Sequence, residues 1–185
     1  LAAISNDPMG KEFERVTFEV NQNAAISIAK AAKKAGINHF IYASSCSVYG
    51  SADAKPRTEN SKLNPLTAYA KSKVWTEKGL ESLASENFII TCLRFSTACG
   101  FSPRLRLDLV LNDFVASAIS TGRIEILSDG KPWRPLINVK DMARAIDWAS
   151  GRSTENGGNF LIVNTGSNEW NYQIRELAMA VQSHL

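Results

Sequence analysis

The chain has 185 residues, 44% of them hydrophobic, which allows one domain with a sizeable core or one domain with an attached lobe. Its net charge of +3 comes from 21 basic and 18 acidic residues without a clustered basic stretch, which argues against a nucleic-acid-binding protein. Three irregularly spaced cysteines (Cys46, Cys92 and Cys99) and only two histidines argue against a disulfide scaffold and a zinc site.

The first part of the chain alternates helices and strands. Apolar residues at helical spacing predict a helix over residues 12–35, which Gly36 ends. The segment HFIYAS predicts a strand over residues 39–44, and a second helix is expected over residues 67–85 after a polar loop. The segment NFIITCLRFS, residues 87–96, predicts another strand. Both strands are apolar on both faces, so this order predicts an α/β fold with a doubly wound parallel sheet.

After Gly100 the predicted elements become shorter and mixed. An amphipathic helix ends at Gly122, IEIL predicts a small strand over residues 124–127, and LINV precedes a helix over residues 140–150. FLIVN then predicts a strand and NYQIRELAMAVQSH a final helix. The expected division is a partial Rossmann-like domain (residues 1–99 and 134–151) and a small mixed α/β substrate lobe (residues 100–133 and 152–185).

Tyr69 and Lys73 stand four residues apart in the second predicted helix, so both side chains leave the same face. A phenol with its ordinary pKa of about 10 is a poor base at neutral pH, but a nearby ammonium group and a cationic cofactor favour the phenolate. Ser45, at the end of the neighbouring strand, can hydrogen-bond the same substrate oxygen. The three residues predict a proton-transfer site for an alcohol or ketone. On spacing alone, the alternative is a surface lysine beside a tyrosine that packs on the sheet.

Four segments carry a family resemblance. LAAISNDP, YASSCSVYG, NPLTAYAKSK and LRFSTACG occur in this order, and together they resemble the extended short-chain dehydrogenase/reductase family, in particular its NAD-dependent nucleotide-sugar epimerases and dehydratases. The resemblance covers essentially the whole chain. It implies a Rossmann-like enzyme that uses NAD or NADP and acts on a nucleotide sugar.

The resemblance also implies roles for individual residues. Ser45 is similar to the family's catalytic Ser/Thr, Tyr69 to its general base and acid, and Lys73 to the residue that holds the nicotinamide ribose. Cofactor contacts are implied for Tyr69, Lys73 and six further residues: Ala2, Ala3, Asn21, Ser44, Phe95 and Ala98. Substrate contacts are implied for Ser45, Thr97, Arg104, Asn112 and Arg134. Arg134 is similar to an arginine that clamps the nucleotide diphosphate, whereas solvated positions are the alternative for Arg104 and Asn112.

Two features depart from the family's pattern. Its 4,6-dehydratases carry an Asp-Glu pair directly after the catalytic hydroxyl, where this chain has Cys46 and Ser47. Neither residue can act as a carboxylic acid or base, so elimination of water is disfavoured. The glycine-rich loop that cradles phosphate and the first strands are missing, which predicts that the chain is a fragment.

The main hypothesis is therefore NAD(P)-dependent epimerisation of a nucleotide sugar through a transient keto intermediate. The alternatives are an NAD(P)-dependent reductase of a ketone or keto-sugar, and a catalytically inactive remnant kept for binding or assembly. The resemblance further implies a homodimer through the helices at 12–35 and 67–85. No long apolar run and no signal peptide are visible, so a cytoplasmic protein without membrane, nucleic-acid or metal partners is expected.

Overall fold

The computed structural model describes residues 3–5, 12–50 and 55–185, and these form two compact units. The first unit consists of the described residues within Leu1–Ser51, Arg57–Arg94 and Ala145–Asn164. The second unit consists of the described residues within Ala52–Pro56, Phe95–Arg144 and Thr165–Leu185. Each unit has its own cluster of buried hydrophobic side chains.

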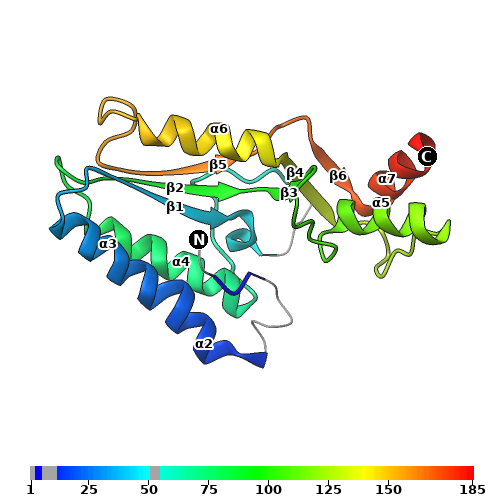
Figure 1. Cartoon of the computed structure of the whole chain (residues 1–185), viewed down its shortest axis with the longest axis horizontal. Helices are drawn as coiled ribbons and strands as arrows, with labels where there is room; N and C mark the ends of the chain where they lie inside the picture. The colour runs from blue at the N-terminus through cyan, green and yellow to red at the C-terminus, as the bar shows by residue number, and fades with distance from the viewer. Residues whose placement is uncertain (1–2, 6–11, 51–54) are drawn as a thin grey trace. The chain divides into compact units, whose positions relative to one another are not determined.

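The first unit is built on a three-stranded sheet in the order β1-β2-β5 (Figure 1). The strands are β1 (His39–Ser45), β2 (Ile89–Phe95) and β5 (Phe160–Thr165). Backbone hydrogen bonds of 2.8 Å link the start of β2 to the residues just before β1 and β5: Ile89 N–H to the Asn38 carbonyl, and Ile90 N–H to the Asn159 carbonyl. All three strands therefore start at the same edge, and the sheet is parallel, as the sequence predicts.

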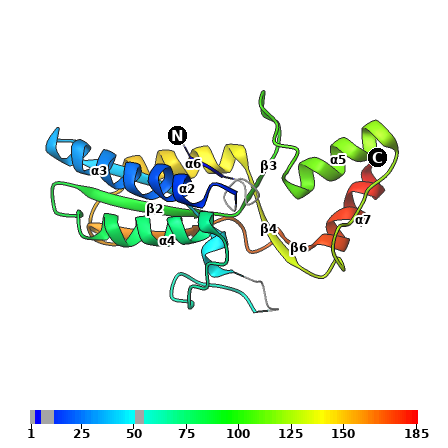
Figure 2. The same ribbon diagram turned by 90° about the horizontal axis from the view of Figure 1, so that it is seen from below.

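Helices cover this sheet on both sides. The helical run α2 (Glu14–Phe18), η1 (Glu19–Asn23) and α3 (Ala24–Lys34) contains one π-helical turn, η1, and packs beside α4 (Ala68–Glu81) (Figures 1 and 2). The residues of α6 (Val139–Ser150) that belong to this unit lie on the opposite face. The predicted helices at 12–35 and 67–85 are thus present, and the strands are buried on two faces because helices flank both.

Close packing of α3 and α4 depends on Gly79. A Cβ atom at this position would overlap Cδ1 of Ile26, so the absent side chain allows the two helices to approach. Nearby, the Phe18 ring stacks on the Trp75 ring with centroids 4.9 Å apart. Under these helices lies the first unit's core cluster: Ala29, Tyr42, Leu80, Phe88, Ile90 and Cys92.

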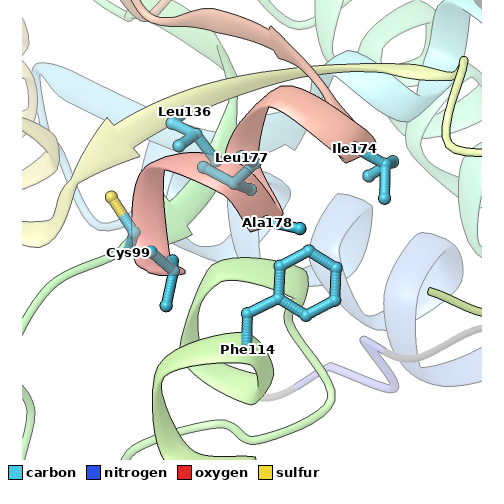
Figure 3. Packing of buried hydrophobic residues seen from close by; sticks show 7 residues of the cluster. Cys99, Phe114, Leu136, Ile174, Leu177 and Ala178 are labelled. Carbon is cyan, nitrogen blue, oxygen red and sulfur yellow. The ribbon is translucent and has the colours of Figure 1, made fainter. Parts of the chain in front are cut away.

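The second unit combines a small mixed sheet with two helices. Its strands are β3 (Thr97–Cys99), β4 (Trp133–Asn138) and β6 (Asn171–Gln173); β3 is parallel to β4, and β4 is antiparallel to β6. Helices α5 (Val110–Thr121) and α7 (Ile174–His184) pack together over a hydrophobic cluster (Figure 3). The buried members of that cluster are Cys99, Phe114, Leu136, Ile174, Leu177, Ala178 and Val181.

Three predicted elements differ from the structure. Residues 124–127 form no strand, since Leu127 is 90% exposed and the segment has no β partner among the described residues. The final helix begins at Ile174 rather than 171, because Glu176 caps it by accepting the Gln173 N–H at 2.8 Å. The FLIVN strand, expected in the lobe at 152–185, pairs with β2 as β5 instead. The assignment of the two units to cofactor and substrate stays a prediction.

Candidate active site

Ser45 lies at the carboxyl end of β1, the edge where parallel α/β sheets bind ligands. The next four residues form a 3₁₀ turn, η2 (Cys46–Tyr49). The Ser45 side-chain oxygen accepts the Ser47 N–H at 3.2 Å and so caps this turn. Since the oxygen acts as acceptor there, the half-buried Ser45 O–H remains available to donate to a ligand.

Tyr69 and Lys73 lie in the first two turns of α4, which begins where the Thr67 hydroxyl accepts the Ala70 N–H at 3.1 Å. The Lys73 Nζ is 5.3 Å from the centroid of the Tyr69 ring, so their side chains share one face of the helix. The same Nζ donates to the carbonyl of Ala43 at 2.8 Å. Because Ala43 precedes Ser45 by two residues, Lys73 joins the start of α4 to the end of β1.

The surroundings of Lys73 control its charge. The residue is 6% exposed, and its Nζ lies 4.8 Å from the Tyr42 ring centroid. Burial lowers the Lys73 pKa to about 8, while the negative charge of Glu77 acts in the opposite direction. The ammonium is therefore still protonated at pH 7, where it can favour the phenolate form of a neighbouring tyrosine. Among the described residues it donates one hydrogen bond, to Ala43, so two further N–H groups can hold ligand hydroxyls.

Asn21, a predicted cofactor contact, lies in the π-helical turn η1 and is 3% exposed. Its side-chain oxygen accepts the Ile4 N–H, and its amide donates to the Ile4 carbonyl, both at 2.8 Å. The amide therefore holds the segment at residues 3–5, in which Ala3 is exposed. Ala2 lies outside the described residues. The cofactor contacts of these three residues stay predictions.

Ser44 is buried, and its hydroxyl donates to the Glu77 carboxylate at 2.6 Å. Its side chain is therefore committed to the protein interior, and its contact with a cofactor stays a prediction that would have to involve its backbone.

The remaining predicted residues belong to the second unit. Thr97 and Ala98 are half-buried on β3 and pair with Leu136 and Ile137 of β4. Arg134 is exposed on β4, with its Nη1 donating to the Trp133 carbonyl at 3.0 Å. An exposed guanidinium keeps donors available for an anion, as a contact to a diphosphate requires.

Three other predicted contacts are placed as follows. Phe95, at the end of β2, is buried. Asn112 of α5 donates its side-chain amide to the Arg106 carbonyl at 3.0 Å. Arg104 is exposed, and its backbone N–H donates to the Ser102 hydroxyl at 3.3 Å. The structure thus gives Asn112 a local structural partner, and the substrate contacts of Asn112 and Arg104 stay predictions.

A buried ion pair next to this site was not expected from the sequence. Glu77 of α4 and Arg94 of β2 have side chains that are 3% exposed. Arg94 donates two hydrogen bonds to the two carboxylate oxygens, at 2.9 and 2.7 Å. The available signal was one charged residue, Arg94, inside a strand that is otherwise apolar on both faces.

Two structural features are absent from the described part of the chain. Within residues 3–5, 12–50 and 55–185, no three His, Cys, Asp or Glu side chains are grouped so that they could hold a metal ion. No described helix is both long and apolar enough to span a membrane.

Comparison with known proteins identifies the family. The model of the NAD dependent epimerase/dehydratase family matches residues 1–166. The chain belongs to this family. The resemblance noted in the sequence is therefore confirmed, and with it the expectation of an enzyme family whose cofactor is NAD.

Curated relatives in the epimerase/dehydratase family are larger than this chain. It is 30% identical over 134 residues to the "Uncharacterized UDP-glucose epimerase YtcB" of Bacillus subtilis, covering 71% of this chain and 41% of that protein. It is also 30% identical over 151 residues to a UDP-glucose 4-epimerase of Mycolicibacterium smegmatis, covering 80% and 47%. The chain thus spans less than half the length of these relatives.

Solved structures agree on the fold. A UDP-glucose 4-epimerase from Thermotoga maritima with UDP-glucose superposes with a TM-score of 0.87 at 22% identity, covering 99% of this chain and 59% of that one. DesIV, a dTDP-glucose 4,6-dehydratase from Streptomyces venezuelae with NAD bound, gives 0.81 at 22% identity, with 99% and 55% covered. At this identity the similarity shows the Rossmann-like epimerase/dehydratase fold, which both reactions share.

Proposed function

We propose that this chain is part of an enzyme that epimerises a nucleotide sugar through a transient ketone, with Ser45, Tyr69 and Lys73 as its catalytic residues. The observation that carries the proposal is the position of the Lys73 ammonium, 5.3 Å from the Tyr69 ring centroid and 2.8 Å from the Ala43 carbonyl. This contact places a buried positive charge beside the phenol and fixes it to the strand that ends in Ser45.

Tyr69 is the residue that moves the proton. Its phenolate accepts the proton of a sugar hydroxyl, and its phenol returns a proton to the carbonyl oxygen when the sugar is reduced on its other face. NAD, when bound, supplies the reversible two-electron oxidation of the sugar carbon. The Ser45 O–H donates to the same sugar oxygen and stabilises it in the ketone. Lys73 favours the phenolate by its charge and offers its two remaining N–H groups to ribose hydroxyls.

The proposed substrate class is a UDP-hexose. Two of the relatives that share about 30% identity with the chain carry the name of a UDP-glucose epimerase. The exposed guanidinium of Arg134 on β4 has the chemistry to bind the diphosphate of such a substrate.

Epimerisation is favoured over dehydration by the residues directly after Ser45. The fold does not discriminate, since epimerases and dehydratases both superpose on this chain. Cys46 and Ser47 begin the turn η2 and carry no carboxyl group. Without an acid or base at these positions, the transient ketone has no group there to assist loss of water.

A homodimer and a cytoplasmic location complete the proposal. Apolar side chains on or next to α2, α3 and α4 remain exposed, including Phe13, Val16, Ile28 and Trp75, and burial of such side chains favours association of two copies. Cys92 and Cys99 are buried thiols, which fit a reducing compartment.

The proposal is tested with UDP-glucose that carries deuterium at carbon 4, incubated with the enzyme and NAD. We expect the 4-epimer as product, with the deuterium retained at carbon 4, because the ketone is reduced before it leaves the site. Free NADH and a released ketone would show a net oxidoreductase instead. A 4-keto-6-deoxy product would show a dehydratase, and a chain that neither binds NAD nor turns over would be the inactive remnant; each of these results would overturn the proposal.

A further inference from the structure

The ion pair of Glu77 and Arg94 connects three elements that surround the proposed catalytic residues. The carboxylate belongs to α4, four residues after Lys73, and the guanidinium belongs to β2. The Ser44 hydroxyl donates to the Glu77 Oε1 at 2.6 Å. Arg94 donates its Nη1 to the Tyr49 hydroxyl at 2.9 Å. All of these side chains lie in the first compact unit.

The two ends of this network lie on either side of Ser45. Ser44 directly precedes it, and Tyr49 ends the 3₁₀ turn that follows it. The Tyr49 hydroxyl is held in turn, since it donates to the Asn164 side-chain oxygen at 2.6 Å. A segment fixed before and after its reactive hydroxyl has little freedom to change position, and catalysis depends on such fixed geometry.

Glu77 also provides the negative charge that Lys73 experiences in the core. The titratable and aromatic groups that face Lys73 are Tyr69 and Glu77 from α4, Tyr42 from β1 and Cys92 from β2. Burial raises the pKa of the Tyr42 phenol and of the Cys92 thiol, so both are neutral at neutral pH. Burial alone would lower the Arg94 pKa, but the hydrogen bonds and charge of Glu77 raise it, so the Arg94 guanidinium stays charged.

We propose that Glu77, held by Arg94, is a positioning residue of the Ser-Tyr-Lys site: it fixes the end of β1 through Ser44 and presents its carboxylate to Lys73, one helical turn before it on α4. This inference rests on the proposed function for its catalytic meaning. The effect of Glu77 on the charge of Lys73 involves residues of the first unit alone, so it can be measured without NAD or substrate.

The test is an NMR titration of the Lys73 ammonium in the chain labelled with ¹⁵N-lysine, with the signal assigned by its loss in Lys73→Arg. We expect Glu77→Gln to lower the Lys73 pKa by about one unit or more, a tenfold change in proton affinity, because the variant keeps the acceptor for Ser44 but removes the charge. An unchanged Lys73 pKa in Glu77→Gln would overturn the proposal.

Two controls separate positioning from general stability. Arg152→Gln removes a guanidinium that is 2% exposed and donates to the Thr91 hydroxyl at 2.9 Å, so it destabilises the same unit but should leave the Lys73 pKa unchanged. Glu81→Gln makes the same chemical change as Glu77→Gln at the exposed end of α4 and should also have no effect. An equal shift in either control would overturn the proposal.

A second variant covers the case in which Glu77→Gln leaves Arg94 as an unpaired buried charge and does not fold. Glu77→Gln/Arg94→Gln removes both charges together, and we expect it to fold with a lowered Lys73 pKa, although the decrease is smaller than in Glu77→Gln because the positive charge of Arg94 is also gone. If this double variant also fails to fold, the pair is a requirement of the fold and the positioning role is rejected. A lowered Lys73 pKa together with no epimerisation by the wild-type enzyme would instead contradict only the proposed function.

Discussion

In the proposed Ser-Tyr-Lys site, the surroundings of Lys73 hold its pKa close to the physiological range. Burial lowers that pKa to about 8, and Glu77 limits the decrease. Below this pH the ammonium is charged and, in the proposed mechanism, favours the Tyr69 phenolate. Above it the ammonium loses its proton, and the support is lost.

We therefore predict that kcat/KM falls as the pH rises through about 8. In Lys73→Arg the guanidinium stays charged to well above this pH, so the fall should disappear or move to a higher pH, although the absolute rate decreases with the altered geometry. The measurement is a pH–rate profile of both proteins. An alkaline limb at the same pH in Lys73→Arg would assign the titration to another group.

Between elements, the close contact of α3 with α4, the helix that carries Tyr69 and Lys73, depends on one glycine. Gly79 provides the space that the Ile26 side chain occupies. We predict that Gly79→Leu lowers the free energy of unfolding by about 1–3 kcal/mol, because it overpacks this contact. Ile26→Ala in the same chain should recover part of the loss. Urea denaturation of the two single variants and the double variant measures the coupling, and purely additive effects would show that the two side chains do not compete for this space.

Some of the helices and strands could be predicted from the sequence, and others could not. The strands β1 and β2 and the helices that flank them follow from apolar runs and helical spacing, which are local properties. The three-residue strands β3 and β6 depend on pairing with β4, which no local pattern reveals. The same limit applies to the site. Tyr69 and Lys73 are neighbours on one helix, whereas Glu77 and Arg94 are brought together only by packing of α4 on the sheet.

For the whole molecule, the proposed homodimer can be tested by substitution of exposed apolar residues. Ile28 of α3 is 61% exposed within the predicted interface. We predict that Ile28→Glu shifts the protein from dimer to monomer in sedimentation experiments, because it places a charge in an apolar contact. Ile119→Glu is the matched control, since Ile119 is 70% exposed on α5, outside the predicted interface. A dimer that survives Ile28→Glu but dissociates in Ile119→Glu would place the interface elsewhere.

The turnover of Tyr69→Phe decides whether Tyr69 moves the proton of the sugar hydroxyl. Tyr172→Phe, which removes a hydroxyl from a tyrosine that packs on the second unit's hydrophobic cluster, serves as the control. We expect Tyr69→Phe to lower kcat by about 10²–10⁴-fold with NAD binding preserved, and Tyr172→Phe to retain most of its turnover. Undiminished turnover in a folded Tyr69→Phe enzyme would show that another group moves the proton.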